Sequence, residues 1–123
     1  MSGINDHLLI GTAQVDDSNT PVLITVKSLF GQPARIGLQL DQDFNDSFDD
    51  QCQEVSIGTN TNLPGKKLRI TASVSDKNIN TDTSGVEFKV MGIPQPVDNT
   101  LFWVIKPSGS HVDYRIDIFF SRT

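Results

Sequence analysis

The residues best suited to chemistry are gathered in one acidic segment near the middle of the chain. Residues 41–54 carry six carboxylates and neither lysine nor arginine. The formal net charge of the 123-residue chain is −5, so the acidity of the whole protein resides in this segment. Closely spaced carboxylate and amide oxygens are the ligands that Ca²⁺ prefers. The candidate calcium ligands are therefore Asp41, Asp43, Asn45, Asp46, Asp49 and Asp50.

The spacing of these acids excludes an EF-hand. Read as a twelve-residue calcium loop from Asp41, the sixth position holds Asp46, where the EF-hand requires glycine. The twelfth position holds Cys52, where a bidentate glutamate belongs.

Residues 41–46 read Asp-Gln-Asp-Phe-Asn-Asp, and this motif resembles the calcium loop of small bacterial calcium-dependent lectins for fucose and mannose. The resemblance implies a self-associating β-sandwich in which calcium bridges Asp41, Asp43, Asn45 and Asp46 to the hydroxyls of a glycan. In that family the loop directly precedes the last strand, and a terminal glycine carboxylate completes the neighbouring subunit's site. Here the motif lies mid-chain, and the sequence ends in Ser121-Arg122-Thr123.

Two other interpretations of the acidic segment stay open. It could be a solvated connection with a short helix, because Phe44, Phe48 and Cys52 stand four residues apart and would share one helical face. It could also be a negatively charged docking surface for a basic protein, with Phe44 and Phe48 as apolar contacts.

Other catalytic constellations are not suggested by the spacing. His7 and His111 lie near opposite ends of the chain and neither belongs to a metal-binding motif. The single cysteine, Cys52, has no base placed by sequence to activate it. The sequence contains no serine-hydrolase elbow, phosphate loop or dinucleotide fingerprint. We therefore expect a protein that is not an enzyme.

The elements that must position these residues are strands, because apolar residues recur with a period close to two. Leu68, Ile70, Ala72 and Val74 alternate with polar residues, which is typical of antiparallel sheets with one buried face. Seven connections rich in Gly, Pro, Asn and Asp separate the strands. Strands are expected near 7–15, 21–29, 34–41, 52–58, 66–75, 86–90, 101–106 and 112–120. The prediction is a single domain over residues 1–123, an all-β, eight-stranded antiparallel β-sandwich, immunoglobulin-like or jelly-roll, with little or no helix.

Two segments break the alternation. Residues 101–105 are apolar on both faces, and Phe119 and Phe120 put one ring on each face of their strand. A strand covered on both faces would explain this pattern, as would an edge tucked under a loop. An exposed apolar patch for self-association would explain it equally. Trp103 and Phe119 are the candidate interface residues for a homo-oligomer, with Trp103 as the anchor.

Composition limits the partners and the compartment. The acidic balance argues against nucleic acid, and no apolar run approaches the length of a membrane span. Hydrophobic residues make up 37% of the chain, enough for a core that needs neither a disulfide nor a cofactor to fold, with calcium as an optional ligand. The N-terminus lacks the features of a signal peptide, which predicts a cytoplasmic protein or export by a signal-less route.

We expect a non-enzymatic binding module for a glycan or protein ligand, in the leading hypothesis a calcium-dependent carbohydrate-binding module that uses the acidic 41–50 loop. The alternative is a structural or assembly subunit that self-associates through apolar strand faces.

Overall fold

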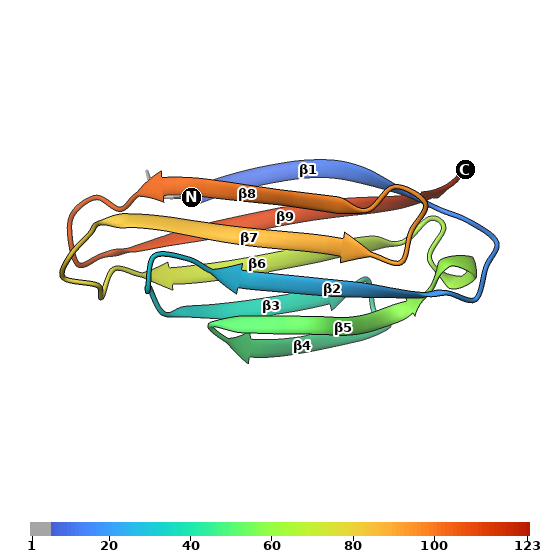
Figure 1. The fold of residues 1–123 in the computed structure, drawn as a ribbon, viewed down its shortest axis with the longest axis horizontal. Coiled ribbons are helices and arrows are strands. Elements are labelled where there is room, and N and C mark those ends of the chain that lie inside the picture. Colours follow the sequence, from blue (N-terminus) through green and yellow to red (C-terminus); the bar gives the residue numbers. More distant parts are fainter. Residues whose placement is uncertain (1–5) are drawn as a thin grey trace.

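The computed structural model describes residues 6–123, and in that range the chain folds into two β-sheets packed face to face (Figure 1). The five-stranded sheet has the order β1 (Asp6–Val15), β9 (His111–Arg122), β6 (Lys67–Ser75), β3 (Ala34–Leu40) and β4 (Phe44–Asp49). The four-stranded sheet has the order β5 (Gln51–Thr59), β2 (Pro21–Ser28), β7 (Thr83–Met91) and β8 (Val97–Val104). One 3₁₀ turn, η1 (Asn60–Asn62), follows β5.

The period-two pattern of the sequence produces the core. In β6 the apolar residues Leu68, Ile70, Ala72 and Val74 are all buried, and the residues between them are half-buried or exposed. The same alternation buries Val86, Phe88 and Val90 of β7 on the facing sheet. These side chains meet between the layers, so the all-β, sandwich-like prediction is confirmed.

The strand count and one pairing differ from the prediction. The described residues contain nine strands, because residues 44–49 form β4 and not a loop or a short helix. Phe44 and Phe48 are four residues apart, a spacing that satisfies a helical face and a strand face equally. Pairing with β3, Leu40 opposite Phe44 and Ile36 opposite Phe48, selects the strand. β1 pairs parallel with β9, so the sandwich is not wholly antiparallel.

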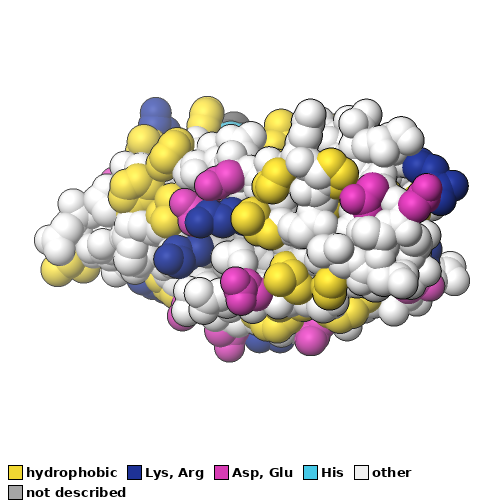
Figure 2. Space-filling model, turned by 45° about the vertical axis from the view of Figure 1, so that its right-hand side comes forward, with side chains coloured by type: hydrophobic (Ala, Val, Ile, Leu, Met, Phe, Trp, Pro, Cys, Tyr) yellow, Lys and Arg dark blue, Asp and Glu magenta, His cyan; other side chains and the backbone are white. Residues whose placement is uncertain are grey.

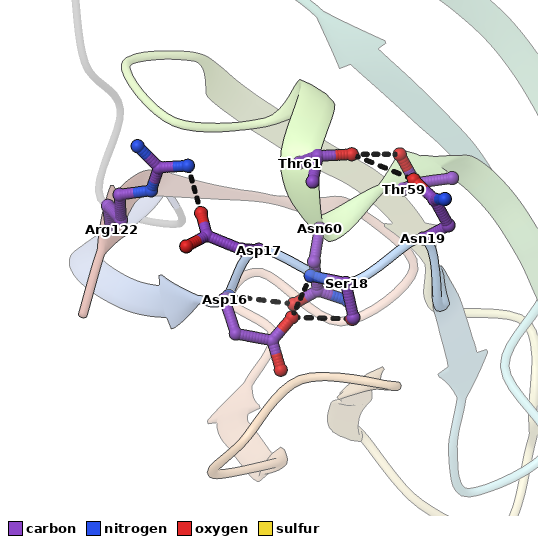
Figure 3. A network of polar contacts seen from close by, with 8 residues as sticks. All are labelled: Asp16, Asp17, Ser18, Asn19, Thr59, Asn60, Thr61 and Arg122. Atoms are coloured by element: carbon purple, nitrogen blue, oxygen red, sulfur yellow. Dashed lines mark hydrogen bonds and ion pairs between the residues drawn. The ribbon is translucent and has the colours of Figure 1, made fainter.

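The two ends of the sandwich are held by buried amides. At one end Asn60 Nδ2 donates to the Thr20 carbonyl at 2.9 Å. Figure 3 shows the bond that Asn60 Oδ1 accepts from the Asp16 N–H at 3.2 Å. The same connection carries Asp17, which forms an ion pair with Arg122 at the end of β9. The β1–β2 connection is thereby fixed to η1 and to the last strand.

At the opposite end Gln32 holds the β6–β7 connection. Its Nε2 donates to Asp76 Oδ1 and to the Thr81 carbonyl, both at 3.1 Å. Its Oε1 accepts the N–H groups of Lys77 and Asn78, both at 2.8 Å. This buried side chain orders the end of the sandwich where β7 begins and β8 ends.

Four strands are edges, and they lie in pairs on the two long sides of the sandwich. β4 and β5 lie along one side, at the bottom of Figure 1, and β1 and β8 lie along the other, at the top. Within residues 6–123 no helix has the length and apolarity needed to cross a bilayer.

Candidate functional site

The acidic segment spans the turn between β3 and β4, the whole of β4 and the start of β5. Its carboxylates engage separate groups along this path. Asp43 forms an ion pair with Lys66, and Asp49 forms one with Arg35 at 3.0 Å. Asp50 Oδ1 accepts the Ala34 N–H at 3.0 Å. Each of these carboxylates therefore bonds to a different group of the backbone or of a neighbouring side chain.

The structure does not bring the predicted calcium ligands into one group. Asn45 and Asp49 point to the outer face of β4, and Asp46 points to the opposite face, because successive residues of a strand alternate. Asp41 lies in the preceding turn, where its Oδ2 accepts the Lys67 N–H at 3.3 Å. Within residues 6–123 no cluster of three or more His, Cys, Asp or Glu side chains is placed to hold a metal ion. The geometry therefore does not favour a calcium loop here.

The acidic segment instead covers one long side of the sandwich. β4 and β5 are the edge strands there, and we call this side the acidic edge. β5 also carries two register shifts against β2, and Glu54 lies in this irregular stretch with φ +51°. Charged side chains and bulges are the devices by which edge strands avoid pairing with another chain.

The opposite side, which we call the open edge, consists of β1 and β8 and lacks these devices. From His7 to Val15, β1 contains no Asp, Glu, Lys or Arg, and its Leu8 and Ile10 are exposed. The register between β7 and β8 runs without a shift over eight residue pairs. Asp98 is the one charged residue of β8. Both strands of the open edge are therefore chemically suited to pairing.

Exposed apolar side chains are concentrated on β8. Phe102, Trp103 and Val104 are 58%, 42% and 48% exposed. The strand expected over residues 101–106 has the bounds Val97–Val104 and is an edge strand, so of the alternatives left open by the sequence a central strand covered on both faces is excluded. The candidate interface residue Trp103 therefore lies half-exposed at the open edge.

Trp103 also closes the gap between the two sheets. Its ring lies 4.3 Å, centroid to centroid, from the imidazole of His7 on β1. The Ser84 hydroxyl donates to the Trp103 carbonyl at 2.8 Å and lies 2.6 Å from the Tyr114 hydroxyl. Burial raises the pKa of Tyr114, so its hydroxyl stays a donor at neutral pH. These contacts fix the backbone of β8 near its C-terminal end.

Phe102 belongs to an aromatic group on the outer face of the four-stranded sheet. Its ring centroid lies 5.8 Å from that of Phe30. Both rings lie over Gly85, where a Cβ atom would come within 3.0 Å of Phe30 and 3.2 Å of Leu29 and of Phe102. Glycine at this position lets the rings pack onto the sheet. Figure 2 shows exposed hydrophobic side chains together toward the left of this face.

Phe119, the other predicted interface residue, is not close to this group. It is 44% exposed on the outer face of the five-stranded sheet, in register with Thr12 of β1 and Lys67 of β6. Phe120 is buried, so the prediction that the two rings lie on opposite faces is confirmed. Trp103 and Phe119 thus belong to different surfaces.

A groove of about 580 Å³ crosses the outer face of the five-stranded sheet. Its floor is formed by small residues in register across three strands, Thr71, Gly37 and Ser47. Arg35 and Arg115 line it. Arg35 donates to Ser47 Oγ at 2.9 Å, so part of the lining is already ordered. Sequence reasoning missed this groove because its residues come from five strands and share no motif.

The histidines and the cysteine occupy separate places. His7 is in register with Tyr114, whereas His111 lies 3.3 Å from Asp113 at the start of β9. Cys52 is buried, and burial raises the pKa of its thiol, which disfavours the nucleophilic thiolate.

Comparison of this chain with protein-family models, with curated proteins and with solved structures found no match.

Proposed function

We propose that this protein is a non-catalytic assembly subunit that associates with copies of itself through the open edge. The observation that supports the proposal is the contrast between the two sides of the sandwich. Charge and bulges protect the acidic edge, whereas β8 presents a regular, apolar and nearly uncharged strand. An unprotected edge of this kind is the usual template for strand pairing between chains.

Apolar burial and backbone hydrogen bonds at β8 would both contribute to association. Full burial of a large apolar side chain contributes roughly 1.5–3 kcal/mol. Phe102, Trp103 and Val104 are about half exposed, so covering them contributes on the order of 1 kcal/mol each. Each backbone hydrogen bond formed at the edge adds about 0.5–1.5 kcal/mol net. Together these terms offset much of the cost of bringing two chains together.

The direct test is the mass in solution of the wild type and of two matched variants. Phe102→Lys places a charge on the open edge, whereas Met91→Lys makes the same type of change on an interior strand of the same sheet. Both residues are exposed and neither change disturbs the core. We expect an oligomer for the wild type and Met91→Lys, and a monomer for Phe102→Lys. A wild type that is monomeric at all concentrations would exclude the proposal.

A second candidate function is supported by the groove on the five-stranded sheet. Its volume lies in the range of small-molecule sites, about 300–1,000 Å³. Hydroxyls and guanidinium groups line it beside the apolar Leu8, a combination suited to a glycan. Of the acidic segment only Ser47 lines it, so this glycan site would not need calcium.

A glycan array probed with the wild type tests this function. Ser47→Trp would fill the groove from β4, and Asn45→Trp places the same ring on the same strand and face outside the lining. We expect Ser47→Trp to abolish binding and Asn45→Trp to retain it, equally with calcium and with chelator. Binding that disappears with chelator would contradict a calcium-independent site and favour calcium ligation by the acidic segment.

A further inference from the structure

We infer that two copies of this chain form a closed dimer in which β8 pairs antiparallel with β8 of the partner about a twofold axis at Phe102. The inference rests on the proposed function, because it presupposes self-association through the open edge. It specifies in addition the symmetry of the dimer, the strand that forms the contact and the register of the two strands.

The backbone of β8 presents the correct groups at the correct residues. The Ile105 N–H donates to the Asp82 carbonyl next to β7 at 2.8 Å, and the Trp103 carbonyl accepts from Ser84 of β7. Backbone groups of a strand alternate in direction with a period of two. The N–H and C=O groups of Thr100, Phe102 and Val104 therefore point away from β7, toward the open side. The Thr100 N–H donates to Asn99 Oδ1 at 2.8 Å, a bond that pairing with a partner strand would replace.

A twofold axis at Phe102 makes these residues partners of one another. Phe102 lies opposite its own copy, and Thr100 lies opposite Val104 of the partner. All three positions carry outward-directed backbone groups, so each such pair exchanges two N–H···O bonds. The resulting ladder would convert two four-stranded sheets into one continuous sheet of eight strands.

The charges of the edge segment fit this register. Residues 97–106 contain two charged residues, Asp98 and Lys106, one on each side of Phe102 and four residues from it. Both are exposed. Lys106 lies two residues past the end of β8, so the twofold register, continued to that residue, brings Asp98 of each copy next to Lys106 of the other and gives the dimer two complementary pairs. Within its own chain Asp98 is in register with Lys89 of β7, which places it between two cations in the dimer.

The apolar residues fit the same register. The two Phe102 rings become cross-strand neighbours on the outer face, next to Phe30 of each chain. On the inner face Leu101 lies opposite Trp103 of the partner. Aromatic and aliphatic cross-strand pairs of this kind stabilise antiparallel sheets.

The alternative of β8 pairing with β1 of the next copy is less well matched. Between His7 and Val15, β1 offers no charged residue to meet Asp98 or Lys106. A β8–β1 contact is also heterologous, and repetition of such a contact produces open filaments unless the rotation closes a ring. The twofold β8–β8 contact satisfies both charges and closes after two copies.

A charge exchange tests the register. Asp98→Lys and Lys106→Asp each turn both complementary pairs into like-charge pairs. At low salt each variant alone should dimerise about tenfold more weakly than the wild type. An equimolar mixture should recover the wild-type association constant within about threefold, because the mixed dimer has opposite charges at both contacts. The control exchange, Lys27→Glu on β2 with Glu54→Lys on β5, changes exposed charges away from β8, and it should neither weaken dimerisation nor show rescue on mixing.

A second measurement uses disulfide capture in a Cys52→Ala background. Thr100→Cys mixed with Val104→Cys should give a mixed disulfide dimer, because directly opposite residues lie about 5.5 Å apart, Cα to Cα. Either variant alone should give little. If Phe102→Lys dissociates the oligomer but the mixed charge variants show no rescue and the cysteine variants form no mixed disulfide, the register is wrong and the proposed function still stands. A wild type that never dimerises would overturn both.

Discussion

The acidic edge should become a second association surface once its charge is removed. The double variant Asp46→Thr/Asp49→Thr neutralises both carboxylates of β4 and keeps a residue that favours strands. It is best made together with Phe102→Lys, so that the open edge makes no contribution. We expect concentration-dependent self-association where the Phe102→Lys parent is monomeric.

The magnitude follows from the spacing of opposite residues in an antiparallel pair. If two β4 strands approached antiparallel about a twofold axis at Asp46, the two Asp46 carboxylates would lie opposite each other, about 6 Å apart. At that distance two unit charges repel by roughly 0.7–2.8 kcal/mol as the effective dielectric falls from about 80 to 20. A register centred on Asp49 brings the two Asp49 carboxylates equally close. Removing this repulsion should raise the association constant about threefold or more at low salt.

The assay is sedimentation velocity over a concentration series at low and high salt. The control variant, Glu87→Thr/Asp113→Thr, removes the same charge from β7 and β9, which are already paired on both sides. We expect the control to remain monomeric. If the control associates as strongly as the β4 variant, net charge and not edge protection keeps the chains apart, and the reasoning fails.

Three further predictions concern stability and its pH dependence. Gln32→Leu leaves the Asp76 carboxylate, the Thr81 carbonyl and the N–H groups of Lys77 and Asn78 without their partner. Chemical denaturation should show that the free energy of unfolding falls by about 3 kcal/mol or more, and a fall below about 1 kcal/mol would contradict the role given to this amide. The bond from the Gly109 N–H is the largest cause of the lowered pKa of Asp76, so the folded state binds a proton less readily than the unfolded state. The stabilisation from Asp76 is present above the unfolded-state pKa and is lost as the pH falls through the lower folded-state pKa. The free energy of unfolding, measured by urea denaturation at a series of pH values, should therefore depend less on pH below about pH 4 in Asp76→Asn than in the wild type. Gly85→Ala should displace the rings of Phe30 and Phe102, lowering the free energy of unfolding by about 1–3 kcal/mol, whereas an unchanged midpoint would show that the rings adapt freely.

Regular alternation made most of the strands predictable. The run from Leu68 to Val74 fixes both the strand and its buried face, because side chains of a strand alternate with a strict period of two. The ends of β8 were less predictable for two reasons. Val97 and Asp98 follow a Pro-rich connection, and in the second half of the strand apolar residues occupy both faces, so the alternation is lost. Its position as an edge depends on strand order, which alternation does not encode.

The structure of the acidic segment could not be predicted from its local sequence. Its residue types and spacing suit a calcium loop, a short helix and a strand alike. The choice was made by pairing with β3, which places Phe44 and Phe48 against the core. Once β4 is a strand, Asp46 and Asp49 lie on opposite faces, and convergence on one ion is lost. The shared role of these acids, along one edge, emerges only from the arrangement of the two sheets.

Backbone hydrogen exchange of β8 tests the central claim most directly. In a dimer joined through the open edge, the amides of Phe102 and Val104 become hydrogen-bonded, and the Thr100 amide replaces its bond to Asn99 Oδ1 with one to the partner strand. We predict that these amides exchange slowly at high protein concentration and rapidly on dilution, while the β4 amides do not change. Equal exchange of the three β8 amides at all concentrations, or protection that develops in β4 instead, would contradict the account.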